Sequence, residues 1–394
     1  MAHADATPVG GPLMTKTYKI LLALLGAWFI LLIYRFAVGI GPVSGLSDGY
    51  PWGIWIAFDV VTGTALACGG YAVAILAYIL NKGKYHPLVR PAILTSALGY
   101  SMAGLSIVID VGRPWLIHNI PIRVFDWNLN SALLEVALCV MAYVGVLWLE
   151  LVPAFLEKAK DASSPGLRRI AEVGLAFFDK ALIWIVALGL LLPTMHQSSL
   201  GTVMLISGHK MHALWATSMI PLLYLVSCIG MGYAVVVWES TLSSRAFNRP
   251  REDSMLKALS GAMIIVLGLF LVIRLVDLVI QGNLMLAFNQ GYLSAFFWLE
   301  NLMAAAAIFY VSGSRRDHFP NIMKAALLIM FGGALYRFNS YILAYDPGPG
   351  WSYFPSVLEL CITFGVVLFE VVLYIFIVKT FPILTGNLPA ESKS

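Results

Sequence analysis

Ten apolar runs, each of about 20 residues, determine what this chain of 394 residues can fold into. In lipid, backbone polar groups must be satisfied within a helix or a closed barrel, and runs of this length favour helices. The sequence therefore predicts an all-α integral membrane protein with ten transmembrane helices. The expected spans are 18–38, 52–80, 91–111, 131–153, 176–195, 214–238, 258–280, 293–313, 321–343 and 354–379.

The low content of charged residues excludes other classes of protein. Only 12% of the residues are charged and 60% are hydrophobic, whereas soluble proteins carry about 25% charged residues. The net charge of +4 is too small to indicate a nucleic-acid partner. The four cysteines lie far apart in separate apolar runs, so no iron–sulfur or disulfide spacing is present. We therefore expect most of the chain to lie within a lipid bilayer.

The distribution of basic residues predicts the orientation, because cytoplasmic loops are enriched in Lys and Arg. Most of the 25 lysines and arginines fall in the segments on the N-terminal side of the membrane. We therefore expect a multi-pass protein of the cytoplasmic membrane with both termini in the cytoplasm. The opposite, outer side holds only four basic residues, namely Arg35, Arg113, Arg123 and Lys210.

Polar residues of the first half are predicted to share one level near the outer surface. A charge inside a span is costly and indicates function by default. At a rise of about 1.5 Å per residue, four successive spans bring a polar residue to this level. Acids outnumber bases there, which suits a site that handles protons. The predicted site comprises Trp55, Asp59, Asp110, Arg113, Glu135, His196 and Gln197.

Trp55 allows two interpretations, because it lies one turn before Asp59 and also near the outer surface. It either forms a wall of a pocket for a flat apolar ligand or belongs to the interfacial aromatic belt.

The second half places a similar set of polar residues near the outer ends of its spans. Ion pairs that only hold helices together are the alternative explanation for both sets, and they carry more weight for this one. This second polar cluster comprises Arg274, Asp277, Glu300, Arg337 and Glu359.

Catalytic and metal-ligand motifs are missing from the sequence. His209 and His212 form a lone pair in a loop, and no histidine is expected in the middle of a span. Neither a metal site nor a haem held by two facing histidines is therefore expected. Any redox chemistry would use electrons from a partner and a diffusible carrier, so it stays uncertain whether the chain is itself an enzyme.

Several runs resemble the NrfD/polysulfide-reductase superfamily. More narrowly, they are similar to the HybB-type membrane subunit of periplasm-facing respiratory nickel–iron hydrogenases. The matching stretches cover most of the chain and are residues 50–59, 67–71, 86–91, 104–113, 192–201 and 353–355.

This resemblance implies two four-helix bundles, helices 2–5 over residues 52–195 and helices 6–9 over residues 214–343. Helices 18–38 and 354–379 would flank them. It also implies a bacterial or archaeal inner membrane and a quinone site, for menaquinone or ubiquinone, near the outer face of the first bundle. That site would lie against a ferredoxin-like iron–sulfur subunit, which exchanges electrons with periplasmic catalytic subunits.

Within that reading, His196 would bind a quinone carbonyl, and the acids would transfer protons. Arg113 would either stabilise negative charge or pair with Asp110. The predicted function is a quinone-reactive membrane subunit of a respiratory oxidoreductase, first of all a nickel–iron hydrogenase, with coupled proton movement as a further hypothesis. The alternatives are the membrane subunit of a polysulfide, nitrite, sulfur or multihaem-cytochrome complex, a secondary transporter, and a structural anchor.

Overall fold

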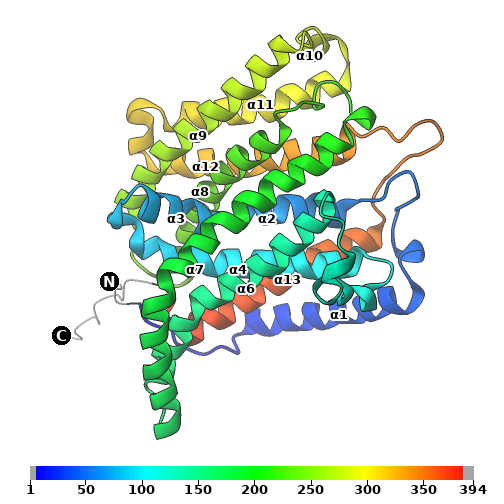
Figure 1. Ribbon diagram of the computed structural model, residues 1–394. Coiled ribbons are helices and arrows are strands. Elements are labelled where there is room, and N and C mark those ends of the chain that lie inside the picture. The colour runs from blue at the N-terminus through cyan, green and yellow to red at the C-terminus, as the bar shows by residue number, and fades with distance from the viewer. Residues whose placement is uncertain (1–5, 385–394) are drawn as a thin grey trace.

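The computed structural model describes residues 6–384, and ten helices in this range are long and apolar enough to cross a membrane. Figure 1 shows them lying side by side, which confirms the all-α prediction. Eight are single α-helices, and the second and ninth spans are composite. The single helices are α1 (Lys16–Val38), α4 (His86–Asp110), α6 (Ala132–Ala159), α7 (Pro165–Ile206), α8 (Ile220–Ala246), α9 (Asp253–Ile280), α11 (Tyr292–Val311) and α13 (Val357–Thr380).

The second span is the centre of the molecule, and 78% of its most apolar stretch is buried. It consists of the π-helix η2 (Trp55–Thr62), α2 (Gly63–Leu66), α3 (Gly69–Ala74) and the π-helix η3 (Ile75–Ile79). Small residues allow its close packing, because a Cβ atom at Gly232 of α8 would collide with the carbonyl group of Cys68. The ninth span joins α12 (Phe319–Phe338) to a further π-helix, η9 (Asn339–Leu343). π-helical turns often occur at functional sites.

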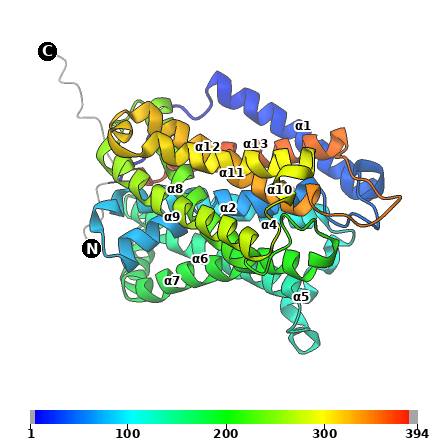
Figure 2. The same cartoon turned by 90° about the horizontal axis from the view of Figure 1, so that it is seen from above.

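The other helices form two groups around this centre (Figures 1 and 2). The first group consists of α3, α4, α6 and α7, in which α6 packs against α4 and α7. The second group consists of α8, α9, α11 and α12, and α8 also packs against α3. α1 and α13 pack together along one side. The division into bundles over residues 52–195 and 214–343 stays a prediction.

Helix α7 differs most from its prediction. The span was expected over 176–195, but the helix runs from Pro165 to Ile206. Hydroxyl groups explain the extra turns, because they donate to carbonyl oxygens four residues earlier and satisfy a polar run inside the helix. These hydrogen bonds include Ser198 to Thr194 and Thr202 to Ser198, at 2.9 and 3.1 Å. The expected loop at residues 196–206 is therefore helical.

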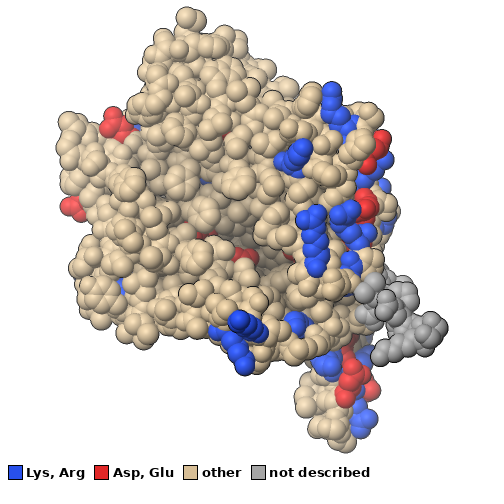
Figure 3. All heavy atoms as spheres, turned by 180° about the vertical axis from the view of Figure 1, so that it is seen from behind, with Lys and Arg blue, Asp and Glu red and all other residues tan. Residues whose placement is uncertain are grey.

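Lys and Arg gather at one end of the molecule (Figure 3). We call it the basic end; there α1 begins and α13 ends, and the Val9 amide donates to the Val378 carbonyl. We call the opposite end the distal end. The asymmetry matches the expected distribution of basic residues, and Lys393 and His3 lie outside the described residues.

Packing of α1 on α13 gives a test of the fold. The Trp28 indole donates to the Ile362 carbonyl at 2.9 Å, and a Cβ atom at Gly365 would overlap the indole ring. We expect Gly365→Ala to lower the free energy of unfolding by about 1–3 kcal/mol through overpacking. Thermal unfolding in mild detergent measures this loss. Gly26→Ala, where an added Cβ meets nothing within 4 Å, is the control and should be neutral or stabilising. Equal stability of the two variants would contradict this account.

Candidate functional site

Two predicted acids meet near the distal end, in what we call the acidic site, formed by Asp59, Ser106 and Asp110. Asp59 lies in η2 and is 6% exposed, and its Oδ2 accepts a hydrogen bond from the Thr363 hydroxyl of α13 at 2.9 Å. The Ser106 hydroxyl of α4 lies beside Asp59, and the Asp110 carboxyl lies within electrostatic reach. Three helices therefore bring these oxygen atoms together.

The carboxyl groups of the acidic site have unused hydrogen-bonding capacity. Buried polar atoms in proteins nearly always have a partner. Here Asp59 Oδ1, Ser106 Oγ and Asp110 Oδ1 are all buried, and within residues 6–384 none has a partner at full hydrogen-bond geometry, although the Ser106 hydroxyl faces the Asp59 carboxyl. Three polar atoms at one place are thus available to a molecule that carries donors and acceptors.

Arg35 of α1 supplies the positive charge at this site, and sequence reasoning missed it. Its guanidinium is 2% exposed and donates to the Ile109 and Val111 carbonyls at 2.8 and 2.9 Å, at the C-terminal end of α4. Cations are stabilised at helix C-termini. Arg35 also lies within electrostatic reach of Asp110. Arg113, the predicted partner of Asp110, is exposed instead.

Trp55 and Glu359 close the distal side of the acidic site. Trp55 is fully buried and donates to the Glu359 carbonyl oxygen at 3.3 Å, so it lies inside the helix packing, which does not fit an exposed interfacial belt. The Glu359 carboxylate accepts hydrogen bonds from the Gly45 and Ser356 amides, both at 2.7 Å. Burial raises the pKa of Tyr353, and its hydroxyl donates to the same carboxylate. Grouping Glu359 with the second-half residues was therefore wrong.

His196 and Gln197 lie in a separate central polar network. Because α7 continues to Ile206, His196 lies about 15 Å from the helix end along the axis. Its Nε2 is 3.3 Å from the Thr64 hydroxyl oxygen, to which the Gln197 amide also donates at 3.1 Å. Arg337 of α12 donates to Gln197 Oε1 at 3.3 Å and so links the two helix groups. The prediction that His196 and Gln197 share the level of Asp59 was wrong.

Two of the predicted second-half residues, Arg274 and Glu300, form a self-neutralising ion pair. Arg274 donates to Glu300 Oε1 at 3.1 Å, and both residues are 2% exposed. Trp215 and Asn339 donate to the same carboxylate at 3.2 and 2.6 Å. Glu300 is therefore saturated with donors, unlike Asp59. This geometry favours the structural explanation of the cluster.

Two other predicted residues lie apart from these groups. Asp277 accepts hydrogen bonds from Thr217 and Gln281 near the end of α9, at 2.6 and 2.8 Å. Glu135 is partly buried in the first turn of α6. Neither residue contributes to the acidic site.

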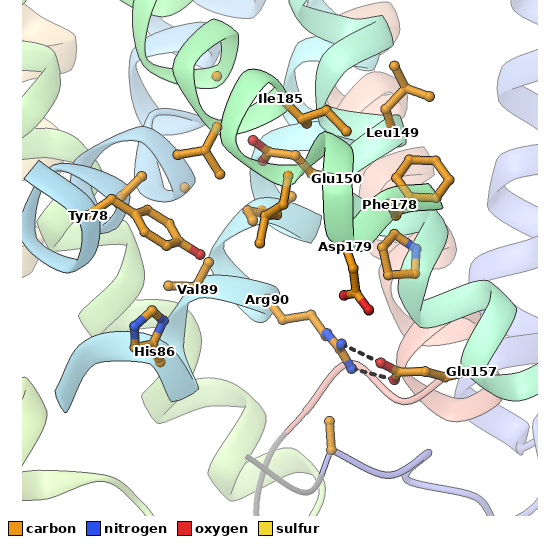
Figure 4. A pocket seen from close by; sticks show the side chains of 18 of the residues that line it. Tyr78, His86, Val89, Arg90, Leu149, Glu150, Glu157, Phe178, Asp179 and Ile185 are labelled. Atoms are coloured by element: carbon orange, nitrogen blue, oxygen red, sulfur yellow. Dashed lines mark hydrogen bonds and ion pairs between the residues drawn. The ribbon is translucent and has the colours of Figure 1, made fainter. Parts of the chain in front are cut away.

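A cavity of about 530 Å³ opens near the basic end, between the second span, α4, α6 and α7. Figure 4 shows Glu150 pointing into it, with Arg90 and Glu157 at its edge. Those two side chains are joined by hydrogen bonds of 2.8 and 2.9 Å. None of the predicted site residues lines this cavity, so it is distinct from the acidic site.

Comparisons with known proteins bear on this arrangement. Residues 42–345 match the family model described as "Polysulphide reductase, NrfD". The chain is 39% identical, over 390 residues, to the "Probable Ni/Fe-hydrogenase 2 b-type cytochrome subunit" of Escherichia coli (strain K12). That match covers 98% of this chain and 96% of the relative.

Two further relatives are more distant. The "Menaquinone reductase, integral membrane subunit" of Nitratidesulfovibrio vulgaris is 27% identical, over 84% of this chain and 83% of its own length. The "Hdr-like menaquinol oxidoreductase integral membrane subunit" of Archaeoglobus fulgidus is 25% identical, over 59% and 53%.

The name of the E. coli relative prompts a test for haem ligands. A transmembrane b-type haem held by histidines needs two imidazoles that face each other inside the spans. The prediction that no histidine lies in mid-span was wrong for His196. The other described histidines lie at helix ends or in loops, so residues 6–384 supply one of the two imidazoles. The described residues do not fit such a haem.

The saturation of Glu300 gives a second test. We expect Arg274→Met to lower the free energy of unfolding by about 3–5 kcal/mol, because it leaves a buried carboxylate without its charge partner. Thermal unfolding in detergent measures the loss. The double variant Arg274→Met/Glu300→Gln should recover much of it, since Gln still accepts from Trp215 and Asn339. If the single variant unfolds at the parental temperature, the ion pair does not hold these helices together.

Proposed function

Because this chain belongs to the NrfD family of membrane proteins, we propose that it is the quinone-reactive membrane subunit of a respiratory nickel–iron hydrogenase. The relative with 39% identity carries a hydrogenase name, and a more distant one is named for menaquinone. In this proposal the chain exchanges electrons between an iron–sulfur partner and the membrane quinone pool. The quinone is a diffusible substrate, and menaquinone is favoured over ubiquinone by the name of that relative.

One observation carries the assignment of the acidic site. Asp59, Ser106 and Asp110 offer three buried oxygen atoms without partners, whereas the Glu300 carboxylate in the second half is saturated. A quinone ring carries two carbonyl oxygens, which become hydroxyls on reduction. A hydroxyl or protonated carboxyl group of the site can donate to a quinone carbonyl. A carboxylate or hydroxyl oxygen of the site can accept from a hydroquinone hydroxyl.

The chemistry of quinone reduction assigns roles to the residues. Reduction of a quinone to a hydroquinone consumes two electrons and two protons. The Asp59 and Asp110 carboxyl groups are positioned to pass those protons, and Ser106 orients the ring. Arg35 lies within electrostatic reach of Asp110 and favours negative charge on the substrate oxygen. Trp55 forms an apolar wall for the ring. His196 takes no part at the ring, because it lies in the central polar network.

The distal end is the proposed docking side for the iron–sulfur subunit, because the acidic site lies there. Electrons would pass from a cluster of that subunit to the quinone ring. With the basic end in the cytoplasm, the docking side faces the periplasm, where the catalytic subunits would lie. Movement of protons across the membrane is a further part of the hypothesis.

Other NrfD-type complexes are the second candidate, favoured by the two relatives whose names refer to menaquinone or menaquinol oxidoreduction. They would use the same acidic site with another catalytic partner. A secondary transporter fits less well, because transporter sites lie near the bilayer midplane and Asp59 lies in the first turns of its span.

Replacement of Asp59 tests the proposed site. We expect Asp59→Asn to lower quinone-linked electron transfer by about 100-fold or more, because the amide cannot pass a proton. The rate is measured in native membranes with the partner subunits present, and their content is quantified in parallel.

Asp277→Asn is the matched control for that experiment, since Asp277 also lies near the distal end of a span but outside the acidic site. It should retain the parental rate. A parental rate for Asp59→Asn in an assembled complex would remove the acidic site from the proposal.

Cysteine labelling tests the orientation. We expect Leu129→Cys at the distal end to react with a membrane-impermeant maleimide in intact spheroplasts. Ser163→Cys at the basic end should react only after permeabilisation. Both positions are exposed, and the background should carry Cys361→Ser because Cys361 is the exposed native cysteine among the described residues. The reverse labelling pattern would invert the topology.

A further inference from the structure

A hollow opens on the lateral face of the molecule, and acidic atoms are visible at its floor (Figure 3). By its place relative to Figure 1, this hollow lies between α12 and α13. The π-helix η2 packs against both of these helices and so lies beneath it. Because this face runs along the sides of the spans, the hollow opens toward the hydrocarbon core of the bilayer.

The second span is open at one position beneath the hollow. On α2, Gly63 and Leu66 are partly exposed, although the span as a whole is largely buried. A Cβ atom at Gly63 would meet only the Phe58 carbonyl oxygen of its own helix, at 3.5 Å. The space beside Gly63 is therefore free of side chains from neighbouring helices.

This open space adjoins the acidic site. Gly63 follows Asp59 by four residues, which is about one turn. On α13, Val367 follows Thr363 by the same number of residues and is 43% exposed. Asp59 and Thr363 are hydrogen-bonded to each other. Both spans run from the distal end to the basic end, so Gly63 beneath the hollow and Val367 on α13 each lie about one turn beyond that bond.

The residues near the hollow are largely apolar, with Asp59 toward the distal end and the partly exposed Glu370 on α13, three residues beyond Val367, nearer the basic end. Phe331 of α12 and Phe364 of α13 are exposed apolar residues of the two flanking helices. Toward the distal end, the unpartnered Asp59 Oδ1 lies one turn from Gly63. A ligand with a polar ring and a long hydrocarbon chain could place its ring at Asp59 and its chain along the apolar residues.

We propose that this hollow, which we call the α12–α13 portal, is the lateral passage by which an isoprenoid quinone reaches the acidic site from the bilayer. Its ring lies against Asp59, and its isoprenoid chain crosses Gly63 between the two helices. This inference rests on the proposed function and adds a binding position for the isoprenoid chain of the quinone.

Filling the portal at Gly63 tests the inference in the intact complex. Gly63→Phe is expected to raise the KM for a quinone with a long isoprenoid chain by about tenfold or more, because the new ring occupies the path of the chain. The KM for a quinone with the same ring and no chain should change by no more than about twofold. Both values are measured with the native partner subunits.

Three further variants complete the experiment. Gly268→Phe on α9 is the matched control, because Gly268 is also partly exposed and an added Cβ there meets nothing within 4 Å. It should leave both KM values unchanged. Gly63→Ala should assemble and change both values little. Val367→Trp fills the portal from an exposed position of α13, so it gives the same selective rise even if Gly63→Phe does not assemble.

The outcomes separate this inference from the proposed function. An unchanged KM for the long-chain quinone in Gly63→Phe or Val367→Trp, or an equal rise for both quinones, would overturn the portal. A parental complex that transfers electrons to neither quinone would contradict the proposed function instead.

Discussion

Inside a bilayer, polar groups find no water, so each buried donor or acceptor must be matched within the protein. The chain meets this requirement almost everywhere through local hydrogen bonds. Hydroxyl groups of α7 donate within their own helix, and Arg35 satisfies carbonyls at the end of α4. Glu300 receives three different side-chain donors. Against this background, the unpartnered oxygens of Asp59, Ser106 and Asp110 are informative, since two of them belong to carboxyl groups, whereas the Glu300 carboxylate has donors on both of its oxygens.

Much of the fold could be predicted because the length of an apolar run decides whether it spans a bilayer. The sequence did not reveal the true ends of α7. Residues 196–202 contain His, Gln, Ser and Gly, which usually indicate a loop, yet their hydroxyls are satisfied by carbonyls of the preceding turn. Only the folded helix shows this compensation. The error placed His196 at the membrane surface, although it lies in the middle of a span. As a result, residues of the acidic site and of the central polar network were predicted to form a single site.

The proximity of Asp59 and Asp110 could be predicted from depth, because they lie on adjacent spans near the same end. Their neighbours could not be identified, since Ser106 and Thr363 are ordinary residues until α4 and α13 pack against the second span. Arg35 did carry a signal, as a lone cation at the end of the first apolar run. It was counted for orientation, whereas its burial and its position beside Asp110 make it part of the site.

The two halves of the chain share one structural feature, a π-helical turn beside a buried carboxyl group, but differ in how that group is hydrogen-bonded. Each places a π-helical turn where a span meets a buried carboxylate, η2 with Asp59 and η9 with Asn339, which donates to Glu300. In the second half the surrounding side chains donate to both oxygens of the Glu300 carboxylate. In the first half the neighbour that would complete the packing is missing, because Gly63 has no side chain and α12 and α13 are separated above it. An open carboxylate beside an open lateral face is costly in lipid unless a ligand occupies it in turn. The unpartnered Asp59 Oδ1 and the unfilled space beside Gly63 lie about one turn apart on the same span, and together they are the basis for the proposed α12–α13 portal.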